Sequence, residues 1–193
     1  MTNTMTNTTK ISLALAALLM SAASPALARG VAGVDVPETL SAEGKTLKLN
    51  GAGIRKKFII KVYVGALYLE NTATSAQEIV KSDQVKVVQM HFLRDVDKEK
   101  IIGAYKEGFE KNSGDKVAQL QAGLDKLKAG LADMKEGGVM TVTYAPGKGT
   151  TVAIKGGPSV SVPGKEFADA LLRNWVGSEP ADGGLKEAML AGK

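Results

Sequence analysis

The chain has 193 residues, a formal net charge of +5 at pH 7, a single histidine and no cysteine. The lack of cysteine excludes disulfides, thiol catalysis and thiolate metal sites. The weak positive charge is spread along the chain, without a basic stretch that alternates with aromatic residues, so we expect no nucleic-acid partner. The length suits one domain.

The N-terminal residues 1–28 are typical of a secretory signal peptide. Lys10 precedes the apolar run "ISLALAALLM", and the segment ends on the small-x-small pattern of Ala26 to Ala28. The run is well short of the roughly 20 residues that a membrane-spanning helix needs, although an uncleaved anchor is the alternative. We predict cleavage after Ala28, export to a bacterial periplasm, no stable membrane insertion afterwards, and a single mature domain at 29–193.

In the first half of the chain, most predicted elements are strands. They are an extended segment at 31–39, strands at 45–51, 58–69 and 84–93, and a short helix at 74–82. The run at 58–69 is the strongest of them, because it is rich in Val, Ile, Tyr and Phe and contains no proline. The sequence Asn-Gly-Ala-Gly at 50–53 predicts a turn or a bulge, since Asn and Gly tolerate positive φ.

The second half alternates blocks of helices and strands. The predicted elements are helices at 97–112 and 116–134, strands at 139–145, 150–155 and 159–162, and closing helices at 164–177 and 181–192. Because the strands cluster in hairpins instead of alternating singly with helices, the fold class is α+β with a large, mostly antiparallel sheet.

A leucine-rich stripe marks the predicted helix at 116–134. Its apolar members recur at steps of three and four residues and are Val117, Leu120, Leu124, Leu127, Leu131 and Met134. This spacing predicts a helix that faces the core. The alternative is a coiled-coil or partner-binding helix, but the stripe is short for a coiled coil.

The strand predicted at 58–69 has two unlike faces, since successive side chains of a strand point to opposite sides. One face is apolar throughout and is predicted to meet the main core; its members are Phe58, Ile60, Val62, Val64 and Ala66. The other face is mixed and is typical of a cavity wall with a polar end. Its members are Ile59, Lys61, Tyr63, Gly65 and Leu67.

Arg55 is the most promising binding residue near this strand. A guanidinium is always charged and can hold a carboxylate with two parallel hydrogen bonds, to which Tyr63 could add a hydroxyl donor. Along one straight strand the two residues would lie about 26 Å apart. They can cooperate only if the chain turns near Arg55 to Lys57; otherwise they are ordinary edge residues, as Lys56 and Lys57 are expected to be solvated turn residues.

Other familiar site patterns fail in this chain. "PGKGTT" at 146–151 lacks the first glycine and the Ser or Thr of a phosphate loop, and "GAG" at 51–53 lacks the last glycine of a dinucleotide-binding motif. His91 has no cysteine or carboxylate cluster beside it, so we interpret it as a strand-face residue. We therefore expect no metal ion and no cofactor.

Three stretches together resemble the chalcone isomerase-like superfamily, in its bacterial exported branch. They are "LNGAGIRKKFIIKVYVGALYLE", "FLRDVDKEKIIGAYKEGF" and "GKEFADALLRNWVGSEPADGGLKEAML". The resemblance covers roughly residues 36–190. It implies an open-faced β-sandwich, in which helices cover a large antiparallel sheet.

The superfamily contains flavonoid-cyclising isomerases and fatty-acid-binding relatives. By resemblance, Arg55 matches the arginine that both kinds share, and Tyr63 matches the tyrosine of the fatty-acid binders. The isomerase tyrosine and asparagine fall near Asp97 and Ala104, and its threonine or serine resembles Asn174. Tyr105 is adjacent to one of these positions. The departures argue against flavonoid cyclisation.

Our leading hypothesis is a non-catalytic periplasmic binding protein for an apolar carboxylate such as a fatty acid, acting as a monomer. The candidate ligand-binding residues are Arg55, Tyr63, Asn174 and Tyr105. The first alternative is an isomerase or intramolecular lyase in which Arg55 stabilises an enolate. The second is an interaction module that uses the striped helix at 116–134.

Overall fold

The computed structural model describes residues 28–192 and contains a seven-stranded sheet in which every neighbouring pair of strands is antiparallel. The strands stand in chain order across the sheet. They are β3 (Thr39–Ala42), β4 (Lys45–Lys57), β5 (Ile60–Leu69), β6 (Lys86–Phe92), β7 (Val139–Ala145), β8 (Gly149–Ile154) and β9 (Ser159–Val162).

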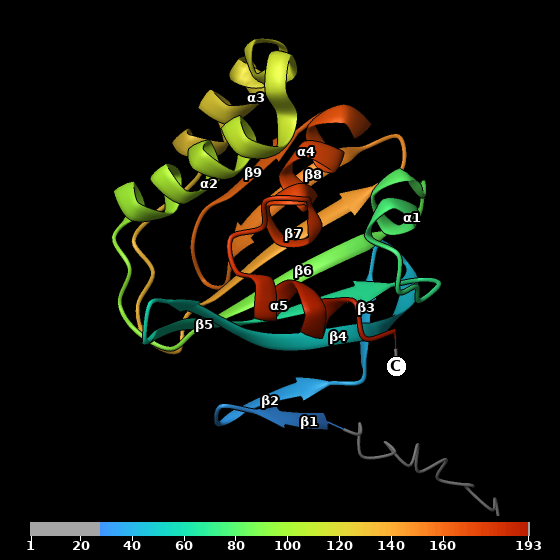
Figure 1. The fold of residues 1–193 in the computed structure, drawn as a ribbon, viewed down its shortest axis with the longest axis vertical. Helices are drawn as coiled ribbons and strands as arrows, with labels where there is room; N and C mark the ends of the chain where they lie inside the picture. Colours follow the sequence, from blue (N-terminus) through green and yellow to red (C-terminus); the bar gives the residue numbers. More distant parts are fainter. Residues whose placement is uncertain (1–27, 193) are drawn as a thin grey trace, which may run out of the picture.

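The helices gather on one face of this sheet (Figure 1). They are α1 (Ala76–Lys81), α2 (Lys98–Ser113), α3 (Val117–Ala129), α4 (Lys165–Val176) and α5 (Gly183–Met189), with a 3-10 turn at Gly114–Lys116 before α3. None of these helices is long and apolar enough to cross a membrane. The predicted α+β class and open-faced sandwich are confirmed.

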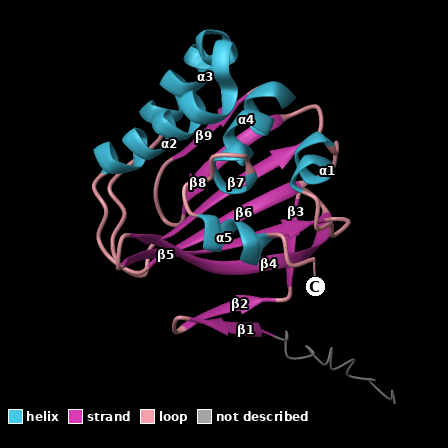
Figure 2. Ribbon diagram, viewed as in Figure 1, coloured by secondary structure: helices cyan, strands magenta, loops and turns pink. Residues whose placement is uncertain are grey.

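The predicted extended segment at 31–39 is a pair of short strands, β1 (Ala28–Val31) and β2 (Val34–Pro37), followed by β3. Figure 2 shows this hairpin on the side of the large sheet that the helices leave uncovered. Val36 packs there with residues of β4 and β5, among them Leu47 and Val64. The sheet therefore has a main core under the helices and a smaller core under β1 and β2.

The predicted assignment of the two faces of β5 is wrong over residues 63–67, whereas Val62, from the predicted apolar face, does lie in the main core. A register shift between Arg55 and Lys56 on the paired strand interrupts the alternation at Val62. Val64 and Ala66, from the apolar face, pack in the smaller core, whereas Tyr63 and Leu67, from the mixed face, lie in the main core. Glycines on β4 and β5 make room for α5 on this side: a Cβ at Gly51 would overlap the backbone carbonyl of Ala188, and a Cβ at Gly53 would overlap the Ala188 side chain. Gly65 adds a close approach to Met189, and the helices on this side define the main core.

The predicted start of β5 is also wrong. The strand β4 runs to Lys57, and β5 begins at Ile60, so Phe58 and Ile59 form the turn of a tight hairpin. The Asn-Gly-Ala-Gly sequence does not end β4; it is a bulge, as a register shift between Leu49 and Gly51 shows. The turn consists of two large apolar residues and contains no Gly or Asn, which are the usual residues of such hairpin turns. The sequence pattern therefore placed Phe58 and Ile59 in the strand.

Helix α3 ends at Ala129, five residues before the predicted end at 134. The chain leaves the helix at Gly130, where a Cβ would overlap the side chain of Val160. Leu131 and Met134 nevertheless remain buried in the main core with the leucines of α3. The prediction of a core-facing stripe is confirmed, and the stripe is not free to act as an interaction helix.

Candidate functional site

A cavity of about 800 Å³ lies between the strands β4 to β6 and the helices α2 and α4. Its apolar wall is formed by Val62, Met90, Phe92, Val96 and Ile101. A basic set of residues lines it as well, namely Arg55, Lys56, Lys57, Arg94 and Lys100. An apolar chamber with cations on its wall suits an amphipathic anion.

The hairpin places Arg55 and Tyr63 opposite each other. They are cross-strand partners in the β4–β5 register, and the guanidinium carbon lies 5.6 Å from the centre of the tyrosine ring. The chain turns at Phe58 and Ile59, directly after the Arg55 to Lys57 segment where a turn was required. Arg55 and Tyr63 therefore lie on the wall of the same cavity.

Arg55 carries an unused hydrogen-bond donor. Its Nε is buried, and no acceptor among residues 28–192 bonds to it. A buried polar group without a partner is uncommon and costs free energy, more so when it belongs to a charged side chain. Because the same residue lines the cavity, a carboxylate held there would satisfy this donor.

The Tyr63 hydroxyl is fixed by a hydrogen bond that it accepts, so its own proton can still be donated to a ligand. The indole Nε1 of Trp175 donates to the Tyr63 hydroxyl at 2.9 Å, so the hydroxyl acts as acceptor in that bond. Burial raises the pKa of Tyr63, although the nearby Arg55 charge opposes the shift. The hydroxyl is consequently protonated at neutral pH and can donate to an anion in the cavity.

Tyr105 and Asn174 also line the cavity, but their hydrogen-bond donors are engaged with the protein. The Tyr105 hydroxyl donates to Met140 Sδ at 3.6 Å. The Asn174 amide donates to the Leu171 carbonyl at 2.9 Å within its own helix. A Cβ at Gly108 would overlap Asn174 Oδ1, so Asn174 lies where α2 and α4 approach each other closely.

A family model described as chalcone isomerase-like matches residues 28–191. The chain belongs to the chalcone isomerase-like family. Among solved structures, this chalcone isomerase-like chain is similar to a fatty-acid binding protein of Arabidopsis thaliana, with a TM-score of 0.66 and 19% identity over 86% of this chain and 96% of that chain. At that identity the likeness shows a shared fold. No curated protein sequence is similar enough to count as a match.

Trp175 is the residue of this chalcone isomerase-like site that the sequence argument missed. It is buried, bonds to Tyr63, and meets the Tyr105 ring edge-to-face with centroids 6.0 Å apart. The available signal was chemical, because a buried indole N–H requires a hydrogen-bond acceptor. Lys56 and Lys57 are exposed, as predicted, yet they also line the cavity.

The titratable groups around the cavity do not resemble a neutral-pH acid–base pair. Burial raises the pKa of both Tyr63 and Tyr105, so their hydroxyls stay protonated at neutral pH and cannot take up a proton there. Glu107 lies on the cavity wall, but its bond to Lys111 lowers its pKa. At the positions that resemble the isomerase tyrosine and asparagine, Asp97 is exposed and paired with Lys100, and Ala104 has no functional group.

His91 lies on β6 and makes a hydrogen bond of 2.9 Å to Gln89, away from the cavity lining. Burial lowers its pKa, so the imidazole is neutral at neutral pH. Within residues 28–192, His, Asp and Glu side chains form no group of three that is suited to a metal ion.

Proposed function

We propose that this chalcone isomerase-like protein binds an apolar monocarboxylate, such as a fatty acid, without converting it. The observation that carries the proposal is Arg55, whose buried Nε has no partner among residues 28–192 and whose side chain lines a cavity of about 800 Å³ with an apolar wall. A carboxylate would accept from the guanidinium and from the Tyr63 hydroxyl, and both donors lie on one hairpin.

The rest of the cavity supports an apolar tail. Val62, Met90 and Phe92 present aliphatic, thioether and aromatic surface from two adjacent strands, and Ile101 faces them from α2. The volume lies within the ordinary range of roughly 300–1,000 Å³ for small-molecule sites. A fully polar anion such as phosphate would leave most of this wall without a partner, so an amphipathic acid suits the cavity better.

The fatty-acid binding protein of Arabidopsis supports the same ligand class through its shared fold. We further propose that the protein works in a bacterial periplasm, because residues 1–28 have the pattern of a signal peptide, and that it works there as a monomer. That leader lies outside the described residues except for Ala28, which begins β1. Intact-mass measurement of the exported protein tests the location: a chain that starts at Arg29 is expected.

Ligand binding is tested by titrating delipidated protein with laurate and palmitate. Arg55→Ala is expected to weaken binding by about 2–5 kcal/mol, which corresponds to at least a thirtyfold rise in Kd, because truncation removes the charge that holds the carboxylate. The matched control is Arg94→Ala, which removes an exposed arginine from the same cavity wall and should change Kd by only severalfold.

A neutral ligand separates the carboxylate from the tail. Dodecanol has the same chain length as laurate, so its binding is expected to be weak and insensitive to Arg55→Ala. Equal laurate affinity for the wild type and Arg55→Ala, or no laurate binding by either protein, would contradict the proposal. If only Arg94→Ala loses laurate affinity, the carboxylate binds at Arg94 and not at Arg55.

A further inference from the structure

The turn between β4 and β5 exposes large apolar side chains. Phe58 is 90% exposed, Ile59 is 93% exposed and Ile60 is 45% exposed. They are the large hydrophobic residues that remain exposed in the part of the chain that the structure describes. Three such residues in succession at the outermost point of a hairpin form a compact apolar tip, and contiguous exposed apolar surface of this kind typically marks a contact with a partner or a lipid surface.

The backbone of this tip is unfavourable for the residue that occupies it. Phe58 has a φ of +57°, at the first central position of a two-residue hairpin turn. Hairpins of this length normally place Gly, Asn or Asp at positions with positive φ, because larger side chains are strained there. The tip therefore retains a large aromatic side chain against the local conformational preference, which points to a role for the side chain itself.

Three lysines surround the apolar tip. Lys56 and Lys57 precede it and Lys61 follows it, and all three are exposed. Lys56 and Lys61 are cross-strand partners, and like charges placed opposite each other destabilise a sheet. None of the three forms a salt bridge with another residue in 28–192, whereas the nearby carboxylates Asp95 and Glu107 are paired with other lysines.

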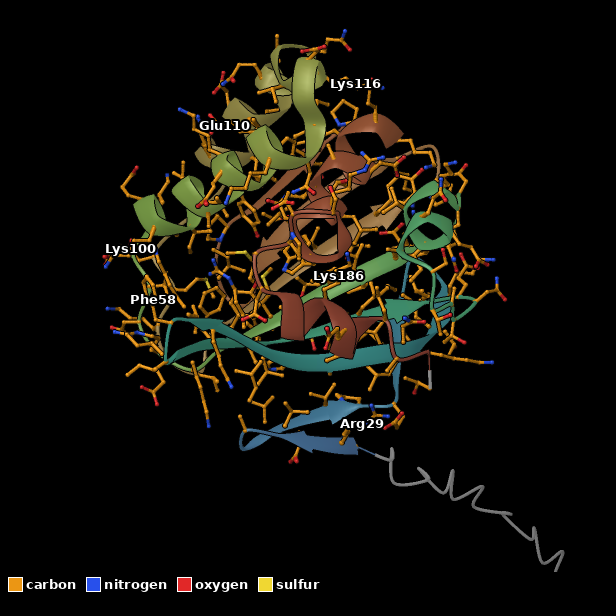
Figure 3. The ribbon with its side chains drawn as sticks, viewed as in Figure 1. Arg29, Phe58, Lys100, Glu110, Lys116 and Lys186 are labelled. Atoms are coloured by element: carbon orange, nitrogen blue, oxygen red, sulfur yellow. The ribbon has the colours of Figure 1, made fainter. Side chains whose placement is uncertain are left out.

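The tip also borders the cavity. Lys56, Lys57 and Phe58 are part of the cavity lining, together with Arg94 and Lys100. Figure 3 shows Phe58 at the edge of the molecule, on the same side as Lys100 at the start of α2. A surface that contacted the tip would therefore lie against the mouth of the cavity.

We propose that the β4–β5 tip docks on the surface of an anionic lipid bilayer. Phe58 and Ile59 enter the boundary between headgroups and acyl chains, while Lys56, Lys57 and Lys61 contact the anionic headgroups. Apolar side chains flanked by lysines are the combination that gives reversible interfacial binding. A second copy of the chain would bring the same three lysines together, so charge complementarity favours the lipid surface.

Membrane docking is a separate proposal that does not depend on ligand binding. If the protein also binds an apolar carboxylate, docking explains how that ligand reaches the cavity. An apolar carboxylate sits in a membrane with its charge at the headgroup level and its tail in the acyl layer. A tip docked at that level would place the cavity mouth where such a molecule enters or leaves the bilayer. The protein would then exchange its ligand with the membrane without spanning it.

The test is flotation of the full mature protein with vesicles of phosphatidylcholine alone and of equimolar phosphatidylglycerol and phosphatidylcholine. The wild type is expected to bind the anionic vesicles more strongly, and added salt should weaken that binding. Phe58→Ser combined with Ile59→Ser should lower the partition coefficient by about tenfold or more, because it removes two buried apolar side chains. Lys57→Ala should lower it by about fivefold on anionic vesicles only.

Two controls separate docking from folding and from charge in general. Lys126→Ala removes an exposed lysine of α3 that forms no salt bridge within residues 28–192, and vesicle binding should not change. Phe58→Gly removes the ring and relieves the positive φ, so it should weaken vesicle binding while thermal stability stays equal or rises.

Laurate titration distinguishes a failure of docking from a failure of ligand binding. Ile59 is not part of the cavity lining, so Ile59→Ser should weaken vesicle binding and keep the laurate Kd, whereas Arg55→Ala should do the opposite. The docking proposal is overturned if the wild type ignores both vesicle types or if the tip variants float as well as the wild type. It is also overturned if light scattering shows that the tip variants convert an oligomer to a monomer, since the tip would then be a protein contact.

Discussion

Arg55 and Lys86 are both cations beside a tyrosine ring on the helix-covered side of the sheet, yet their surroundings differ. Arg55 lies 5.6 Å from the centre of the Tyr63 ring, and Lys86 Nζ lies 5.3 Å from the centre of the Tyr144 ring. Tyr63 pairs with Phe92 at one end of β6, whereas Lys86 begins that strand at the other end. The two cations therefore mark opposite ends of one layer.

The hydrogen bonds of the two cations account for the difference in role. Lys86 is 3% exposed and donates to the carbonyls of Ile79 and Val80 at 2.8 and 2.9 Å, with Asp169 4.0 Å away. The space beside it is only about 20 Å³. Arg55 instead has an unpartnered Nε and a cavity of about 800 Å³. A buried cation whose donors are satisfied is costly to truncate, because its partners are left unpaired, whereas an unsatisfied one is available to a ligand.

The largest effect on stability is expected when the satisfied cation is removed. Lys86→Ala should lower the free energy of unfolding by about 2–4 kcal/mol, because it leaves a void, two carbonyls with fewer donors and Asp169 with one cation fewer. Arg55→Ala should change it by less than about 0.5 kcal/mol without ligand, since the lost ring contact is offset by release of a buried unpaired donor.

Urea denaturation of both variants beside Lys126→Ala, an exposed lysine with no salt bridge in the described chain, measures this contrast. If Arg55→Ala is as destabilising as Lys86→Ala, the conclusion that Lys86 has a structural role and Arg55 does not is wrong.

A pH profile should show a smaller effect at Lys86. Burial lowers its pKa to about 8, although Asp169 opposes the shift, whereas the ordinary value is 10.5. Between these two pH values the unfolded chain binds more protons than the folded one, so the contribution of Lys86 to the free energy of unfolding rises with pH. The cost of burying the charged amine is fully present below about pH 8. The stability of wild type relative to Lys86→Met should increase by about 1–3 kcal/mol from pH 8 to pH 10.5.

Urea denaturation at several pH values checks this sign, with Lys126→Met as the exposed control. A flat difference between wild type and Lys86→Met would mean that Lys86 keeps an ordinary pKa in the folded protein.

The smallest of the three effects concerns the tyrosine on the ligand side. Tyr63→Phe removes the acceptor of the buried Trp175 N–H and should cost about 1–2 kcal/mol of stability. Tyr105→Phe is the matched control, because its hydroxyl meets only the sulfur of Met140 at 3.6 Å and should cost less than about 0.5 kcal/mol. Thermal denaturation distinguishes them, and equal losses would show that the Trp175 bond is not the source.

Short-range patterns predicted most of the fold. Hairpin clustering of the strands, the leucine stripe of α3 and the closing helices at 164–177 and 181–192 all follow from periodicity and turn residues. The turn at Phe58 and Ile59 did not, because its apolar residues look like strand. The predicted end of the helix at 134 was wrong for a similar reason, since Leu131 and Met134 are buried outside the helix.

Residue patterns alone were enough to place Arg55 and Tyr63 near an apolar strand and to predict the elements of an α+β sheet protein. The packing of distant segments was needed to bring Arg55 and Tyr63 together, to put the mixed face of β5 at residues 63–67 under the helices, and to bond Trp175 to Tyr63. Alternation separates the two faces of a strand, but the helices that cover one face choose which of them is inside. Here α5 lies on the face where Gly51, Gly53 and Gly65 carry no side chain.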